Sequence, residues 1–207
     1  MSDLLGRPRM FMPGTRLFVF VRHAESSANL AGVVSSDPAH PVWLTARGKL
    51  QARQLGVQLA GIDIDLAVAT RMARTQQTVQ LALEDRNVPL VIEPGLDEID
   101  SGDLDGAPIG AYWDWQQHHR SNERFPNGET VNDALLRYGS SLERMLSRGE
   151  PVTLVVLHEF ALRRIVEAAR GLRSPTEAFA NAVPYFLDEH AVGRAAAVLK
   201  SMARSSA

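Results

Sequence analysis

The sequence contains no cysteine among its 207 residues. This absence excludes disulfide bonds, zinc sites with thiolate ligands and a thiol nucleophile. Long apolar runs are missing too: none approaches the roughly 18 residues of a membrane-spanning helix, and residues 1–15 lack the apolar stretch of a signal peptide. The formal charge is only −2, which gives no electrostatic reason to expect nucleic acid or an anionic membrane as a partner. We therefore expect a cytoplasmic protein that binds neither.

What the chain does contain fits one domain of ordinary size. Apolar residues make up 45% of the sequence and charged residues 22%, as in proteins with a packed core. We expect a flexible N-terminal arm at residues 1–15 and a single domain at 16–207. Within that domain, a stretch rich in Gly, Asp and aromatics predicts a loop-like lid, inserted at about residues 99–128. The sequence leaves a homodimer open.

Strand-like and helix-like segments alternate along the chain. Short apolar runs predict strands at residues 17–21, 65–69, 151–158 and 195–199. Apolar residues at helical spacing predict helices at residues 45–60, 72–86, 131–148 and 159–170. This alternation predicts an α/β fold, a three-layer α/β/α sandwich around a mostly parallel sheet. Functional sites of such sheets gather where strands end and helices begin.

Two of the predicted strands end in histidine. The segment FVFVRH ends at His23, and TLVVLH ends at His158. If both strands are central and parallel, the two imidazoles emerge at one edge of the sheet, where neighbouring strands lie about 5 Å apart. One such histidine alone is usually structural, but two at equivalent positions indicate a site that holds one small ligand.

The residues around these histidines distinguish two kinds of site. His23, Glu25, His158 and Glu159 could together ligate a metal ion. Arg22 argues against this, because a permanent cation beside His23 disfavours a bound cation and favours an anion. A neutral imidazole next to fixed positive charge is suited to attack phosphorus. The sequence therefore favours a phosphate site without a metal.

Several motifs now resemble those of the histidine phosphatase superfamily, also called phosphoglycerate-mutase-like. The family signature Arg-His-Gly-Glu-Thr, followed by an asparagine, is matched by residues 22–26 and Asn29. Further family elements are matched by LTARGKLQA (44–52), TRMARTQQT (70–78), LDEIDSGDLDG (96–106), NGET (127–130) and VVLHEF (155–160). The matches extend over most of the chain, and their combination is specific.

The resemblance implies a role for each matched residue. His23 is expected to be the nucleophile that becomes phosphohistidine. Arg22, Arg74 and a protonated His158 are expected to surround the transferring phosphoryl group, with Asn29 assisting. No metal or other cofactor is implied, because guanidinium and imidazolium groups supply the positive charge that phosphoryl transfer needs.

Two acidic residues complete the predicted site. Glu98 is expected to donate a proton to the leaving oxygen and later to activate water, and neighbouring acids would raise its pKa as that role requires. Glu159 directly follows His158, so it is placed at the substrate site. The alternative for Glu159 is a helix-start residue that points outward.

The sequence departs from the family pattern beside both histidines. Ala24 stands where a glycine is usual, and Glu159 and Phe160 replace two glycines. Leu104 and Asp105 replace a common Trp-Glu pair. These changes leave the phosphate-binding set intact.

Substrate choice is expected to depend on the lid. Tyr112, Trp113 and Trp115 could line an entrance, and Arg120 or Arg124 could hold a second negative group of the substrate. The alternative is that these aromatics only pack the lid down and the arginines are solvated.

The leading hypothesis from the sequence is a metal-independent phosphomonoesterase that hydrolyses a small phosphorylated metabolite through a phosphohistidine. A phosphoglycerate-type mutase and a non-catalytic phosphate-binding module are the alternatives. The short lid argues against the mutase, and the intact nucleophile and arginines argue against the binding module.

Overall fold

The computed structural model describes residues 15–171 and 179–205 of the chain. Its centre is a five-stranded sheet in the order β3-β2-β4-β1-β5. The strands are β1 (Leu17–Arg22), β2 (Leu66–Ala69), β3 (Leu90–Ile92), β4 (Val152–Leu157) and β5 (Pro184–Asp188). Neighbouring pairs among the first four are parallel, and β5 runs antiparallel to β1 at one edge. The predicted flexible arm, apart from residue 15, lies outside the described residues.

The central strands β1, β2 and β4 are mostly apolar because both faces of the sheet are covered. In β1, Phe18 and Phe20 point into one hydrophobic cluster, and Val19 and Val21 point into the other. The register pairs Val19 with Leu154 and Val21 with Val156 of the parallel strand β4. This alternation fixes the direction in which the residues after each strand leave the sheet.

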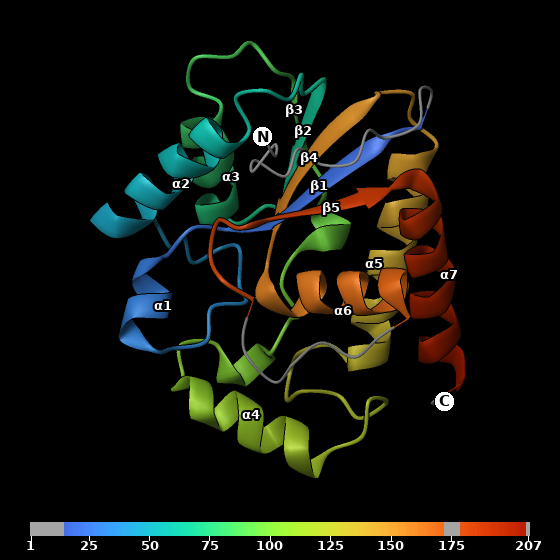
Figure 1. Ribbon diagram of the computed structural model, residues 1–207. Coiled ribbons are helices and arrows are strands. Elements are labelled where there is room, and N and C mark those ends of the chain that lie inside the picture. The colour runs from blue at the N-terminus through green and yellow to red at the C-terminus, as the bar shows by residue number, and fades with distance from the viewer. Residues whose placement is uncertain (1–14, 172–178, 206–207) are drawn as a thin grey trace, which may run out of the picture.

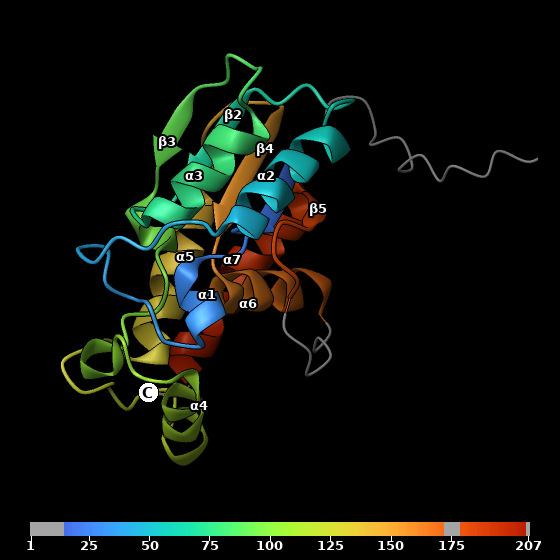
Figure 2. The same cartoon turned by 90° about the vertical axis from the view of Figure 1, so that its left-hand side faces the viewer.

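Helices cover the two faces of the sheet and produce the predicted three layers (Figure 1). One face packs on α2 (Ala46–Gln58) and α3 (Ala73–Ala82), and the other on α5 (Val131–Leu146), α6 (Glu159–Arg170) and α7 (Glu189–Ser205). The short helix α1 (Ser27–Ala31) and the helix α4 (Ile109–His118) lie beyond the ends of the strands, close to the beginning of α6 (Figure 2).

The structure corrects the sequence-based expectations in several places. The predicted strand at 195–199 lies inside α7, where Ala195, Ala196 and Leu199 are buried at helical spacing. The strands β3 and β5 were not predicted: β3 has only three residues and half-exposed sides, and β5 begins with a proline. The expected lid loop contains α4 and a short 3₁₀ helix at Gly102–Leu104, and another 3₁₀ helix, at Pro94–Leu96, precedes it. Predicted helix ends at 86 and 148 fall earlier, at Ala82 and Leu146.

Within the described ranges 15–171 and 179–205, none of the helices combines the length and the apolar character that a membrane crossing requires.

Candidate active site

The parallel strands β1 and β4 deliver the two histidines to one place. Arg22, the last residue of β1, lies opposite Leu157, the last residue of β4. His23 and His158 therefore leave the sheet side by side, with ring centroids 5.4 Å apart and an angle of 63° between the rings. Both side chains are buried. The structure thus brings together the two residues that the sequence predicted to meet.

Arg74 of α3 connects the two imidazoles. Its Nε donates to Nε2 of His23 at 3.1 Å, and its Nη2 donates to Nδ1 of His158 at 3.1 Å. A guanidinium can only donate hydrogen bonds, so both of these ring nitrogens present a lone pair. The oxygen atoms of Ser35 hold the other side of the guanidinium, at 3.0 Å and 2.9 Å. Burial lowers the pKa of Arg74 to about 10, which leaves it charged at neutral pH.

The backbone fixes the ring of His23. Its Nδ1 lies 2.8 Å from the carbonyl oxygen of Ala24, so the ring proton resides on Nδ1 and the Nε2 lone pair faces Arg74. Burial lowers the pKa of His23 well below its ordinary value, and the charges of Arg74 and Arg22 lower it further. His23 is therefore a neutral imidazole. Its unprotonated Nε2 faces a cationic site, and an unprotonated nitrogen is what a nucleophile needs.

A chain of hydroxyl groups orients His158. Its Nε2 lies 2.9 Å from Oγ1 of Thr70, which lies 2.9 Å from Oγ1 of Thr75. Thr75 in turn donates to the carbonyl of Met72 at 2.8 Å. Burial, followed by the charge of Arg74, lowers the pKa of His158. Because Nδ1 of His158 accepts from Arg74, that nitrogen carries no proton, and the protonated state that the resemblance implied is disfavoured in this structure.

Arg22 supplies a second guanidinium at the end of β1. Its Nη1 donates to the carbonyl of Phe179 at 2.7 Å, and its buried Nε has no hydrogen-bond partner among the described residues. Burial lowers the pKa of Arg22, whereas the carboxylates of Glu159 and Glu98 raise it. A buried donor without a partner is costly. The Arg22 side chain also lines the cavity, where its positive charge favours an anionic ligand.

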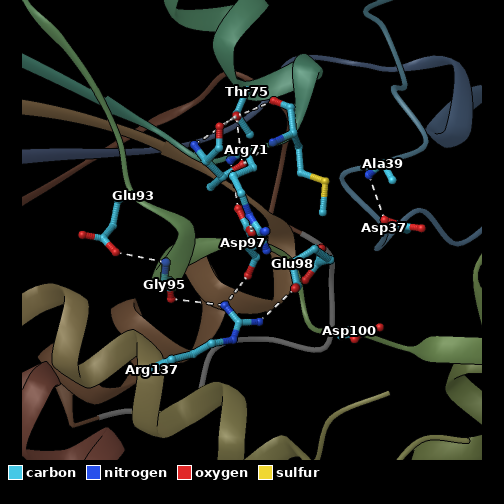
Figure 3. Close-up of polar contacts among 12 residues, drawn as sticks. Asp37, Ala39, Arg71, Thr75, Glu93, Gly95, Asp97, Glu98, Asp100 and Arg137 are labelled. Atoms are coloured by element: carbon cyan, nitrogen blue, oxygen red, sulfur yellow. Dashed lines mark hydrogen bonds and ion pairs between the residues drawn. The ribbon is translucent and has the colours of Figure 1, made fainter. Parts of the chain in front are cut away.

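Glu98 lies in the segment after the first 3₁₀ helix, and two arginines hold that segment (Figure 3). Arg137 of α5 donates to the carbonyl oxygens of Gly95, Asp97 and Glu98 at 3.1, 2.7 and 2.8 Å. Arg71 binds the carboxylate of Asp97 through its backbone N–H at 2.9 Å and its Nε at 2.6 Å. These contacts fix the backbone on both sides of Glu98.

The Glu98 carboxyl has the pKa of a group that can give and take a proton near neutrality. Desolvation raises its pKa to about 7, against the opposing effect of the charge of Arg74. The acids that neighbour Glu98 in the sequence were expected to cause such a shift. Desolvation is instead the main cause, and Glu159 adds a smaller contribution of the same sign.

These groups share one cavity of about 320 Å³. Arg22, His23, Arg74 and Glu98 line it, while His158 lies behind the lining and reaches the site through Arg74. Asn29 also lines the cavity, but its side-chain oxygen accepts from the backbone N–H of Ser26 at 3.0 Å, at the start of α1. Its part in ligand binding stays a prediction.

Glu159 faces the same cavity at the beginning of α6. Its Oε1 accepts from Nε and Nη2 of Arg163, one turn along the helix, at 3.0 Å and 2.8 Å. The carboxylate is thus held in place at the edge of the phosphate site, and its role in binding substrate is also a prediction.

The lid contributes differently from what the sequence suggested. Tyr112 and Trp113 of α4 line the cavity, but Trp115 stacks on Phe125 with ring centroids 3.9 Å apart and is absent from the cavity lining. Arg124 is bound to the carbonyl of Gly128 and the carboxylate of Asp133. Neither Arg120 nor Arg124 lines the cavity, so the structure does not support either as the holder of a second anionic group.

The departures beside the histidines are accommodated without strain. Ala24 is fully buried in a hydrophobic cluster, and its N–H donates to Thr78 at 3.1 Å. Its backbone does not adopt a positive φ, so an alanine fits as well as a glycine. Phe160 packs under the lid in the other cluster, with its ring centroid 6.3 Å from that of Tyr138.

Sequence reasoning missed several residues that support the site. Thr70 was noted only as part of a motif, and nothing marked Ser35 as a partner of Arg74. Asp105, which replaces a family glutamate, accepts hydrogen bonds from the backbone N–H groups of Ser36 and Asp37 and so holds the loop that carries Ser35. Nothing in the sequence marked Arg137 as a partner of the Glu98 segment. Only the arrangement in space distinguishes these side chains.

No group of three or more histidines or acids in the described part of the chain is arranged to hold a metal ion. Two neutral imidazoles, two arginines and a carboxyl of raised pKa at the carboxyl ends of parallel strands define the site of a phosphoryl-transfer enzyme. The chain belongs to the histidine phosphatase superfamily (branch 1), whose sequence profile matches residues 18–182. The predicted family, its fold and the phosphatase class of enzyme are confirmed.

Known relatives agree with this assignment. The adenosylcobalamin/alpha-ribazole phosphatase of Escherichia coli is 38% identical over 100 residues, which cover 48% of this chain and 43% of that protein. A 2,3-bisphosphoglycerate-dependent phosphoglycerate mutase of Methylobacterium radiotolerans is 33% identical over 175 residues, covering 76% of this chain and 80% of the mutase. The crystal structure of the alpha-ribazole phosphatase from Shigella flexneri has the same fold, with a TM-score of 0.69 at 24% identity over 82% of this chain and 89% of that one.

Proposed function

We propose that the protein is a metal-independent phosphomonoesterase that hydrolyses a small phosphorylated metabolite through a phosphohistidine at His23. The observation that carries this proposal is the position of Arg74, which is hydrogen-bonded to Nε2 of His23 and to Nδ1 of His158 in one cavity. A phosphoryl group that binds there meets the nucleophile and positive charge together. The absence of cysteine fits a cytoplasmic enzyme.

The reaction consists of two in-line transfers. In the first, Nε2 of His23 attacks phosphorus, the bond between phosphorus and the alcohol oxygen breaks, and the Glu98 carboxyl gives its proton to that oxygen. In the second, the Glu98 carboxylate takes a proton from water, the water oxygen attacks phosphorus, and the N–P bond breaks. His23 is then neutral again and Glu98 is protonated, so the cycle closes.

Charge stabilisation comes from the groups that already face the cavity. Arg22 and Arg74 would neutralise the equatorial oxygens of the transferring group, in the place of the metal ions of many other phosphoryl-transfer enzymes. The first turn of α6 directs its backbone N–H groups toward the same region. His158 would gain a proton or donate to an oxygen as negative charge develops.

Trapping the intermediate tests the proposal. The wild-type protein, mixed with a ³²P-labelled phosphomonoester and quenched in alkali, should retain label that survives alkali and is lost in acid. The His23→Ala variant should retain none. Chelators should leave turnover unchanged. A metal requirement, or equal labelling of His23→Ala, would contradict the proposal.

Mutase activity is a second candidate because several relatives of this chain are phosphoglycerate mutases. An assay with 3-phosphoglycerate as substrate discriminates the two activities. A mutase would form 2-phosphoglycerate faster than it releases inorganic phosphate. A non-catalytic phosphate-binding module would show neither reaction and no labelled histidine. We expect phosphate release to exceed isomerisation.

A further inference from the structure

The outer part of the cavity is apolar, unlike the phosphate site at its base. Side chains from the loop after α1, from α4 and from the start of α6 form its wall: Val33, Val34, Ile109, Tyr112, Trp113 and Phe160. Two of them remain partly exposed to solvent, Ile109 at 42% and Trp113 at 45%. Exposed apolar groups that line a cavity next to a catalytic centre indicate a surface for an apolar ligand group.

In the described part of the chain, the charged groups of this wall outside the phosphate site are carboxyls, and one of them is ion-paired with Arg163. Among the described residues that line the cavity, the cations are Arg22 and Arg74, both at its base. The remaining charged groups are the carboxyls of Glu98 and Glu159. The guanidinium of Arg163 is hydrogen-bonded to Glu159 and lies 5.2 Å from the ring centroid of Phe179. A second anionic group on the ligand would therefore meet the carboxylate of Glu159, whose described partner cation, Arg163, is already bound to it.

We infer that the alcohol part of the substrate is uncharged and carries an aromatic ring, and that Glu159 excludes phosphoesters with a second anionic group. This inference rests on the proposed function, whose substrate class it specifies. The ring would stack on Trp113, as aromatic groups do at centroid separations of about 4.5–7 Å. The carboxylate of Glu159 acts by repulsion, which is a common source of specificity.

The inference also distinguishes this site from one that handles phosphoglycerates. A phosphoglycerate carries a carboxylate beside its phosphate, and a bisphosphoglycerate adds another dianion. Each needs cations beyond those that hold the first phosphoryl group. In this cavity the described lining residues other than Arg22, His23 and Arg74 are apolar, uncharged polar or acidic, and none of them is a cation.

Binding of non-hydrolysable phosphonates tests this directly. Isothermal titration calorimetry would compare benzylphosphonate with 4-carboxybenzylphosphonate, which differ by one carboxylate. We expect wild-type protein to bind the neutral-ring compound about tenfold more tightly, since one added charge near a fixed carboxylate costs this much at short range. Glu159→Gln should narrow that ratio about fivefold by improving the affinity for the carboxylated compound.

Glu167→Gln provides the matched control. Glu167 is on the same helix and faces an arginine, with its Oε2 3.7 Å from Nη1 of Arg164, but it does not line the cavity. We expect this variant to keep the wild-type ratio of the two affinities. A change equal to that of Glu159→Gln would mean that the net charge of the helix, and not Glu159, sets the preference.

Two results would overturn the inference. One is equal or tighter binding of 4-carboxybenzylphosphonate by the wild-type protein, a comparison that needs no variant to fold. The other is an unchanged ratio in a folded Glu159→Gln variant. Hydrolysis of benzyl phosphate is measured separately: selective binding without phosphate release would contradict only the proposed function, and phosphate release without selectivity would contradict only this inference.

Discussion

The base of the cavity, which is the phosphate site, differs in construction from its mouth, which is the apolar wall that includes Ile109 and Trp113. At the base, nearly every polar atom is paired within the protein: Arg74 makes four hydrogen bonds, to His23, His158 and two atoms of Ser35. At the mouth, Ile109 and Trp113 are large apolar side chains that remain partly exposed to solvent. Hydrogen bonds within the protein thus fix the base in advance. The exposed apolar side chains of the mouth are available for contact with a ligand.

This difference teaches where the chemistry and the selectivity of the site reside. Phosphoryl transfer depends on charge held in fixed positions, so the base should tolerate almost no change. The mouth contributes contact area and repulsion, which vary gradually with each side chain. Substitutions at the base should therefore act on turnover of all substrates, and those at the mouth should act on the choice among them.

The largest effect is expected for Arg74→Lys. A lysine keeps the charge but cannot donate to both imidazoles at once, so kcat/KM should fall about a thousandfold for every phosphoester. Arg53→Lys is the control, because Arg53 pairs with Glu84 on the surface between α2 and α3. Steady-state kinetics with 4-nitrophenyl phosphate gives the measurement. A decrease in kcat/KM of less than tenfold would show that the double hydrogen bond of Arg74 is not essential for catalysis.

Glu98→Gln sharpens the comparison within the base itself. Turnover of benzyl phosphate should fall about a hundredfold, because its alkoxide leaves only with a proton. Turnover of 4-nitrophenyl phosphate, whose phenolate leaves unaided, should fall less than about fivefold. Equal losses on the two substrates would show that Glu98 is not the proton donor.

The pH dependence follows from the same carboxyl group. The pKa of Glu98 is raised to about 7, and only the protonated form can donate. The kcat/KM for benzyl phosphate should therefore be full below pH 7 and fall about tenfold for each pH unit above it. The profile for 4-nitrophenyl phosphate should lack this fall near pH 7. A benzyl phosphate profile that stays level from pH 6 to 9 would contradict the assignment.

A smaller effect is expected where Arg137 supports Glu98 from behind. Arg137→Gln removes donors to three carbonyl oxygens along the Glu98 segment. The kcat for benzyl phosphate should fall about fivefold with little change in KM, and that for 4-nitrophenyl phosphate should change less. Arg144→Gln is the control on the same helix, where Arg144 binds Glu93 near the surface. If Arg137 had a purely structural role, the substitution would lower kcat equally for both substrates.

The smallest effect belongs to the mouth. Trp113→Ala should lower kcat/KM for benzyl phosphate about threefold relative to methyl phosphate, since it removes one side of an aromatic contact. Competition between the two esters in one reaction measures this ratio without a separate estimate of active enzyme. If kcat/KM falls equally for both esters, Trp113 affects the base and not only the mouth. The proposed separation of turnover from selectivity would then be wrong.

The predictions from the sequence were most accurate where a pattern had a single physical solution. Two fully apolar runs ending in histidine must be buried strands, and the structure places them side by side as β1 and β4. The predicted strand at 195–199 was wrong because alanines and a valine suit a buried helix as well as a strand. The helix α4 was missed because glycine and proline before it suggested a loop.

The sequence by itself determined the reactive groups and their approximate meeting place, because an apolar strand run followed by a histidine is a local pattern and parallel strands end at the same edge of a sheet. Only the tertiary structure decided which nitrogen of each imidazole is free, why Glu98 titrates near neutrality and which side chains form the mouth. Those properties depend on burial and on hydrogen bonds between residues far apart in sequence, such as Arg74 with Ser35 and Arg137 with Glu98. No pattern along the chain encodes such contacts, because they exist only once the segments have packed together.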